Sequence, residues 1–137
     1  MLAKLSSVKP IHAVWPAGAL AALAAVFIFA AMNRQQTQLV ARDMTAGDPS
    51  RAPVWIRRYG CSGCHTIPGI PGADGQVGGP LSGMRSRIYI AGVVTNTPEH
   101  LLEWIVDPQK FSPRTAMPAS GISVEQARDV AAYLYGR

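Results

Sequence analysis

Cysteine is scarce in this chain, and its scarcity removes several kinds of site. The 137 residues contain two cysteines, Cys61 and Cys64, and three histidines. The single disulfide that they allow would close a small, strained loop and add little stability. Zinc needs about four ligands; because His12 lies beside an apolar run, Cys61, Cys64, His65 and His100 are the only full set. No βαβ pattern surrounds the cysteines, which disfavours a thioredoxin-like site.

Charge is absent from the segment Ile11 to Met32, which holds no Asp, Glu, Lys or Arg over 22 residues. As a helix it would be about 33 Å long, enough to cross a hydrocarbon core of about 30 Å. A cleaved signal peptide is the alternative, since Lys4 and Lys9 form a basic start. The apolar centre of a signal is shorter, however, at about 7–15 residues. We therefore expect an uncleaved transmembrane anchor over residues 11–32.

Acidic residues are absent before Asp43. All eight lie from there onward with nine of the thirteen basic residues, which leaves that part near +1. The formal charge of +5 therefore belongs mainly to residues that flank the apolar run: Lys4, Lys9, Arg34 and Arg42. No basic stripe remains for nucleic acid, so we expect no such partner. The basic start favours residues 1–10 in the cytoplasm and the chain after Arg34 outside it.

The feature that is present and informative is Cys61-Ser62-Gly63-Cys64-His65, the attachment pattern of a c-type haem. Each cysteine adds across one vinyl group of the porphyrin, and the histidine directs a ring nitrogen at the iron. The pattern predicts one covalently bound haem c, with His65 as an iron ligand. Attachment needs reduced thiols at an otherwise oxidising cell face, so we expect the domain outside the cytoplasm. The sequence contains no second motif of this kind, which argues against a dihaem peroxidase.

A second iron ligand is expected at Met117. Electron-transfer cytochromes commonly use a His and a Met, and the thioether raises the reduction potential. Met117 precedes Pro118 in a loop rich in Pro and Ser, where the backbone is restricted and no helix needs the side chain for packing. Met84 and His100 are the alternatives, although a packing role suits Met84 and a helix-end position suits His100. Packing alone is also the ordinary role of any methionine.

The rest of the chain reads as short helices joined by long loops, an all-α fold. We expect a polar linker over 33–50 broken at Gly47-Asp48-Pro49, a short helix over 53–59, a Gly- and Pro-rich loop over 66–83, an extended stretch over 86–94, a helix over 97–107 and a last helix from Ser123. Thr97 is the expected N-cap of the first long helix, and Ser123 with Gln126 forms a capping box for the last. A domain of about 95 residues is small, so we expect it to need its cofactor to fold.

These features resemble the class I monohaem cytochromes c. Within that class the chain looks most like the cytochrome c domain attached to subunit II of caa3-type haem-copper oxidases. The residues that carry the resemblance are Cys61 to Ile67, Ser86-Arg87, Asn96 to Glu99, Trp104 to Pro108, Met117-Pro118 and Ala127 to Leu134. The resemblance implies a haem domain over residues 51–137.

The resemblance also implies a partner for the haem-ligating histidine. In such cytochromes a backbone carbonyl in a Gly-Pro-x-Leu turn accepts the proton of that histidine, which fixes the ring and tunes the iron. Here the turn reads Gly78-Gly79-Pro80-Leu81. Aligned on Leu81, the proline position of the family holds Gly79. Either Gly79 or Pro80 therefore supplies the carbonyl.

By the same resemblance, Arg87 pairs with a haem propionate and Trp104 packs by the haem edge. The implied function is single-electron transfer in a respiratory chain, to or within a terminal oxidase, by a single-pass protein of the bacterial cytoplasmic membrane with a periplasmic haem domain. We do not expect the chain to be an oxidase subunit II with its own copper centre, because the sequence has no copper-ligand cluster. A subunit of another membrane complex, such as a reaction centre or a dehydrogenase, is an alternative. A gas-binding or peroxidatic haem protein is another, and there Met117 would only pack.

Overall fold

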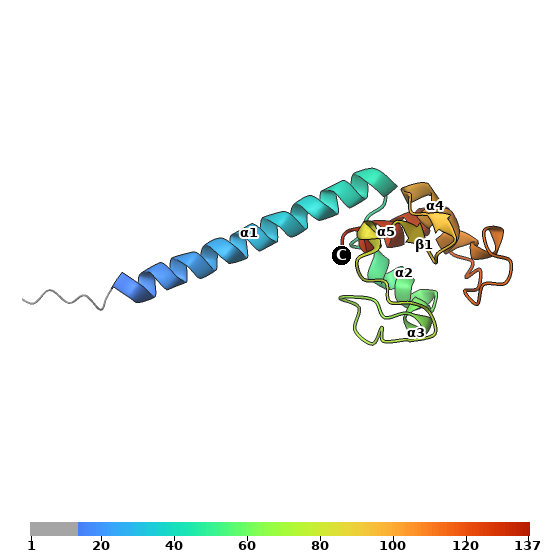
Figure 1. The fold of residues 1–137 in the computed structure, drawn as a ribbon, viewed down its shortest axis with the longest axis horizontal. Coiled ribbons are helices and arrows are strands. Elements are labelled where there is room, and N and C mark those ends of the chain that lie inside the picture. The colour runs from blue at the N-terminus through green and yellow to red at the C-terminus, as the bar shows by residue number, and fades with distance from the viewer. Residues whose placement is uncertain (1–13) are drawn as a thin grey trace, which may run out of the picture. The chain divides into compact units, whose positions relative to one another are not determined.

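The computed structural model describes residues 14–137, so the predicted cytoplasmic segment 1–10 and the first residues of the predicted anchor lie outside the described residues. The chain divides into two units, Met1–Asn33 and Arg34–Arg137. Helix α1 (Val14–Thr45) crosses this boundary (Figure 1). Its sequence is rich in alanine and leucine, which favour helix. Among the described residues one helix, Gly18–Thr45, is long and apolar enough to cross a membrane, and its apolar window is exposed.

The second unit is mostly helical, which confirms the expected fold class. Its elements are α2 (Ala52–Arg58), α3 (Cys61–Cys64), the 3-10 turn η2 (Met84–Ser86), strands β1 (Tyr89–Ile90) and β2 (Val94–Thr95), α4 (Pro98–Val106), the 3-10 turn η3 (Pro108–Lys110) and α5 (Val124–Tyr135) (Figure 1). The strands pair antiparallel, with Tyr89 opposite Thr95. They fall near the stretch that we expected to be extended.

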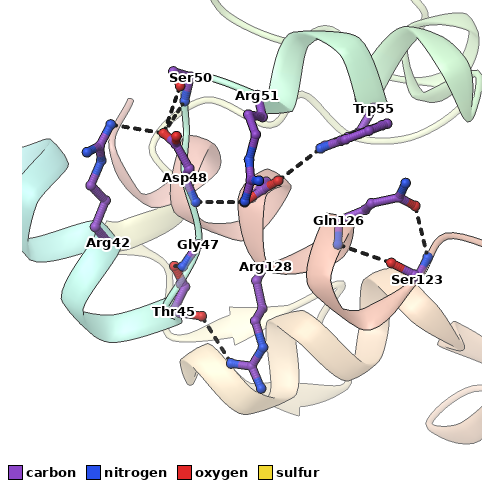
Figure 2. Close-up of polar contacts among 11 residues, drawn as sticks. Arg42, Thr45, Gly47, Asp48, Ser50, Arg51, Trp55, Ser123, Gln126 and Arg128 are labelled. Carbon is purple, nitrogen blue, oxygen red and sulfur yellow. Dashed lines mark hydrogen bonds and ion pairs between the residues drawn. The ribbon is translucent and has the colours of Figure 1, made fainter.

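Helix α5 lies at the centre of this unit and contacts both α2 and α4. It buries a continuous set of side chains at helical spacing, among them Ala127, Val130, Ala131 and Leu134. Its N-terminus carries the predicted capping box between Ser123 and Gln126 (Figure 2). On α4 the Thr97 side chain accepts the backbone N–H of His100 at 3.2 Å, so the predicted N-cap of that helix is confirmed as well.

The turn after α1 is packed against α5. Ala41 and Thr45 are buried near the end of α1. Gly47 touches the α5 backbone so closely that a Cβ there would lie 2.7 Å from the amide nitrogen of Asp129. The Arg128 guanidinium donates to the carbonyl oxygen of Thr45 at 3.1 Å (Figure 2). The end of the expected linker thus contacts the haem domain; the boundary at residue 51 stays a prediction.

Asp129 joins this turn to α2 and α5. Its carboxylate is 2% exposed and accepts the backbone N–H of Asp48 at 2.7 Å, a guanidinium N–H of Arg51 at 3.0 Å and the indole N–H of Trp55 at 2.9 Å. Figure 2 shows the dashed lines from the Asp48 backbone nitrogen and from Trp55 ending beside Arg51, whereas the Asp48 side chain faces Arg42 and Ser50. We call Asp48, Arg51, Trp55 and Asp129 the Asp129 cluster. A buried carboxylate with three donors is well compensated, so the cluster fixes the start of α2 on α5.

Candidate haem site

The two cysteines lie one helical turn apart. Gly60, with φ of 71°, starts the single turn α3, and residues three apart on such a turn share a face. Cys61 and Cys64 are half-buried free thiols. His65 leaves the turn in extended conformation, with φ of −117° and ψ of 142°, and its backbone N–H donates to the Cys61 carbonyl at 2.9 Å. The helical turn thus positions the two thiols, and the extended backbone that follows it sets the direction of the His65 imidazole.

The imidazole of His65 is oriented by one bond. Its Nδ1 lies 2.7 Å from the carbonyl oxygen of Gly79. A carbonyl only accepts, so Nδ1 carries the proton and Nε2 keeps the lone pair. The sequence left the carbonyls of Gly79 and Pro80 as candidates for this bond, and in the structure the Gly79 carbonyl binds the ring. The bond leaves Nε2 free to bind iron.

Two glycines in the loop over 66–83 let it approach the motif closely. The backbone N–H of Gly78 donates to the Cys64 carbonyl at 2.8 Å. A Cβ at Gly78 would lie 2.6 Å from Nδ1 and 2.8 Å from Nε2 of His65. A Cβ at Gly75 would lie 2.6 Å from the Cys64 carbonyl carbon. Sequence reasoning missed both positions, because nothing local distinguishes them from the loop's other glycines.

The turn that follows Gly79 is held by Arg87 and by the strand-like backbone of Thr66. The Arg87 guanidinium donates to the carbonyl oxygen of Pro80, and to that of Ser82 at 3.0 Å. The N–H of Leu81 donates to the Thr66 carbonyl at 2.9 Å, and the Leu81 side chain packs half-buried against the core. Arg87 therefore stabilises the turn that orients His65, and its pairing with a propionate stays a prediction.

Met117 lies in a separate loop that is anchored on α4. Its side chain is half-buried against the core. Its backbone N–H donates to Oγ1 of Thr115 at 3.3 Å, and its carbonyl accepts from Nε2 of Gln109 at 2.8 Å. Near the start of this loop, Phe111 stacks on the buried Trp104 with 6.0 Å between ring centroids. Met117 and Trp104 thus belong to one group of contacts, whereas His65 belongs to the group around Gly79.

The alternative ligands have other contacts. Met84 is 4% exposed and packs in the core. His100 places Nδ1 2.9 Å from the Thr95 carbonyl, and its ring meets Phe111 edge-on. These contacts are those of packing residues. His100, like His65, keeps the lone pair on Nε2, but it does not follow the two cysteines that attach the haem.

Asn96 is a half-buried residue whose linking role the sequence did not reveal. Its Nδ2 donates to the carbonyls of Met84 at 2.7 Å and Arg87 at 2.9 Å, and its Oδ1 accepts the hydroxyl of Tyr135 at 2.7 Å. Burial, with a smaller contribution from Glu99, raises the pKa of Tyr135 to about 12. The link connects α5 to the segment that holds the His65 turn.

The rival uses of the cysteines are disfavoured by the site. Burial raises the pKa of the Cys61 thiol, whereas reactive redox cysteines have lowered pKa values. Across residues 14–137, no group of three His, Cys, Asp or Glu side chains lies close enough to hold a metal ion. The free thiols and the lone pair on Nε2 of His65 instead fit a covalently attached haem, so the site defines a c-type haem protein.

Comparison with known proteins gives the same result. The family described as Cytochrome c matches residues 57–136, more than half of the chain, so this chain belongs to the cytochrome c family. It therefore carries a covalent haem c and transfers electrons. The chain is 37% identical over 76 residues to "Cytochrome c oxidase subunit 2" of Alkalihalophilus pseudofirmus. That match covers 54% of this chain and 21% of the relative, so the chain spans about a fifth of the relative's length. No solved structure matches it significantly.

Proposed function

We propose that the chain is a membrane-anchored cytochrome c that passes single electrons to or within a terminal oxidase complex of a bacterial respiratory chain. The observation that carries this proposal is the similarity of 76 residues of this chain to part of a cytochrome c oxidase subunit 2. The apolar helix at its N-terminal side supports it, because an oxidase is itself a membrane complex.

In this proposal Cys61 and Cys64 hold the haem through thioethers, and His65 binds the iron through Nε2. Bound haem c supplies one-electron oxidation and reduction. The Gly79 carbonyl fixes the ring and makes the imidazole a stronger donor. Met117 would supply a second ligand to the iron through its thioether. With His65 and Met117 both bound to the iron, the haem would serve electron transfer and not the binding of a substrate.

Three further residues shape the edge of the site in this proposal. Pro80 and Leu81 continue the turn from Gly79, which Arg87 braces. Arg87 has five guanidinium N–H donors, of which two bind the carbonyls of Pro80 and Ser82, so other N–H groups remain for the predicted pairing with a propionate. Trp104 lines the haem edge from α4. These roles come from the family resemblance and are compatible with the contacts described above.

The proposed topology places residues 11–32 across the cytoplasmic membrane, residues 1–10 in the cytoplasm and the haem domain in the periplasm. The apolar, exposed surface of α1 supports a single span. Tethering raises the effective concentration of the haem domain near its partners. Protease treatment of spheroplasts tests the sidedness: digestion of the haem domain in intact spheroplasts supports the proposal, and protection until lysis contradicts it.

The ligand assignment predicts the behaviour of Met117→Ala. Losing the thioether lowers the reduction potential and opens the ferrous iron to carbon monoxide. The measurement is an optical spectrum of the full-length protein from membranes, oxidised, reduced and then with carbon monoxide. The wild-type protein should show the Met-to-ferric charge-transfer band and no response to carbon monoxide. Rapid uptake by the wild-type protein would instead favour the gas-binding alternative.

The partner is tested by purification from membranes in mild detergent. Co-purification with a haem-copper oxidase, and oxidase turnover that falls when the gene product is removed and returns when it is restored, support the proposal. Co-purification with a reaction centre or a dehydrogenase instead would assign the chain to another electron-transfer complex. Carbon monoxide difference spectra of the purified complex distinguish an oxidase from these alternatives, because its catalytic haem binds carbon monoxide.

A further inference from the structure

We propose that Gln109 is a positioning residue for the iron ligand Met117: by binding the Met117 carbonyl it keeps the thioether in its ligating position. This inference rests on the proposed role of Met117. It extends that role by naming the residue that controls how often the thioether leaves the iron. The test below separates the failure of this inference from the failure of the ligand assignment.

Both polar groups of the Met117 backbone are bound by side chains. Nε2 of Gln109 donates to the Met117 carbonyl at 2.8 Å. Oγ1 of Thr115 accepts the Met117 N–H at 3.3 Å, which is the longer and weaker of the two bonds. Pro118 restricts the conformation of Met117 from the other side. The backbone of Met117 is thus held by two side-chain hydrogen bonds, in addition to the packing of its own side chain against the core.

The amide of Gln109 carries a cost that packing does not explain. Its Oε1 is buried and has no hydrogen-bond partner in the described part of the chain. Turning the amide over would place Oε1 against the Met117 carbonyl, so the bond through Nε2 fixes its orientation. A buried acceptor without a partner destabilises a fold, and an apolar side chain of similar size would avoid that cost. The favourable contribution of Gln109 at this position is therefore the hydrogen bond that its Nε2 donates to Met117.

The turn that carries Gln109 is itself held by hydrogen bonds and by buried packing. Gln109 follows Pro108, which is fully buried, in the turn η3 at the end of α4. The N–H groups of Phe111 and Ser112 both donate to the Pro108 carbonyl, at 3.2 and 3.0 Å. Phe111 in turn stacks on Trp104 of α4. Movement of Met117 away from its position therefore breaks a bond to the turn η3, not to another part of its own loop.

The inference predicts a change in the balance between bound and released Met117. Removing one hydrogen bond of ordinary strength shifts such an equilibrium by about fivefold to tenfold. In Gln109→Leu the apparent affinity of the ferrous protein for carbon monoxide, and of the ferric protein for imidazole, should rise by about that factor. The Met-to-ferric charge-transfer band should also disappear at a lower pH than in the wild-type protein. Gln109→Glu keeps the size of the side chain, loses the donor and should shift both quantities in the same direction.

Gln126→Leu is the matched control. Gln126 is also a half-buried amide, and its Oε1 accepts the hydroxyl of Tyr59 at 2.7 Å and the N–H of Ser123 at 3.3 Å. Its loss should lower the melting temperature without touching the Met117 loop. All variants are compared as the haem-loaded full-length protein, with melting temperature measured beside carbon monoxide titration, imidazole titration and the charge-transfer band.

The outcomes separate cleanly. A rise in affinity for both probes in Gln109→Leu and Gln109→Glu, absent from Gln126→Leu, supports the positioning role. If the Gln109 variants change only the melting temperature, as Gln126→Leu does, Gln109 is a structural residue and the inference is wrong while Met117 remains a ligand. If the wild-type protein lacks the charge-transfer band and binds carbon monoxide freely, Met117 is not the ligand and both proposals fall.

Discussion

His65 depends on a neighbour that has no side chain. Gly78 lies against the imidazole, and the next residue, Gly79, supplies the carbonyl that binds Nδ1. The two glycines differ in what surrounds them, since a Cβ at Gly79 would meet nothing within 4 Å. Neither residue has a positive φ. Adjacent positions of the same residue type therefore carry different constraints.

Gly78→Ala is expected to displace the imidazole, because the added methyl group would overlap the ring. Overpacking of this kind costs about 1–3 kcal/mol. Haem content per chain, measured as the pyridine haemochrome, should fall, and the reduction potential of the remaining protein should change. Gly79→Ala is the control and should retain both values. Equal haem content and potential in the two variants would show that the ring tolerates the methyl group.

Tyr135 makes stability depend on pH at the alkaline end. Burial raises its pKa to about 12 from 10.0, so the neutral hydroxyl is favoured in the folded state. Its stabilising contribution is full below pH about 10 and is lost as the pH rises toward about 12. Tyr135→Phe removes this dependence together with the bond to Asn96, which contributes about 1 kcal/mol.

The measurement for Tyr135 is the free energy of unfolding by urea at pH 9 and pH 11. The wild-type protein should be more stable than Tyr135→Phe at pH 9, and the difference should shrink at pH 11. Other tyrosines and lysines titrate equally in both proteins, so the difference isolates this hydroxyl. A difference that stays constant between the two pH values would contradict the raised pKa.

At the scale of elements, α5 combines an apolar surface with one buried charge. Its small residues allow α2 and α4 to approach, and Asp129 uses the same helix to hold the turn before α2. An exposed partner such as Arg51 contributes little by itself. The two N–H donors from Asp48 and Trp55 matter more, because these residues are half-buried and bind a carboxylate that is itself buried.

Asp129→Asn is expected to destabilise the haem domain by about 1–3 kcal/mol, since one of the three donors then faces an amide N–H. Urea unfolding of the haem-loaded protein, followed by tryptophan fluorescence, measures the change. Asp43→Asn makes the same chemical change at an exposed position of α1 and should stay within about 0.5 kcal/mol of the wild-type protein. Similar stability of all three proteins would mean that the Asp129 cluster is energetically unimportant.

What the sequence could predict depends on how local the signal is. The caps at Thr97 and Ser123 depend on residues three positions apart, and both could be predicted from the sequence. The short helix before the motif was also expected within one residue of its position. Asp129 was not singled out, because its partners lie 74 to 81 residues away. Gln109 was missed for a similar reason: its role depends on how a loop returns to the end of α4.

At the scale of the whole molecule, the structure divides the chain after Asn33, and the boundary of the haem domain at residue 51 stays a prediction. A change from apolar to polar composition marks where a span ends but not where a domain begins. Burial of Ala41 and Thr45 could not be inferred, because their partners lie on the last helix. The haem motif and the family could be predicted from the sequence, because the attachment chemistry fixes the spacing of Cys61, Cys64 and His65.

Two shortened chains test this division. A chain that starts at Arg34 keeps the packing of Ala41, Thr45 and Gly47 on α5 and should match the full-length protein in unfolding free energy. A chain that starts at Arg51 loses that packing and the bond from Asp48, so it should be less stable by at least about 2 kcal/mol. Thermal and urea unfolding of the haem-loaded proteins measure both. Equal stability of the two chains would place the true boundary at residue 51.

The burial of Ala41 also limits how far the haem can travel from the lipid surface. On the proposed topology the span ends at Met32, and Ala41 is the first buried residue of the unit that begins at Arg34, which leaves the eight residues 33 to 40 between them. These residues belong to α1 and span about 12 Å as helix. The connection is therefore short, and on this topology a redox partner has to meet the haem domain close to the membrane surface.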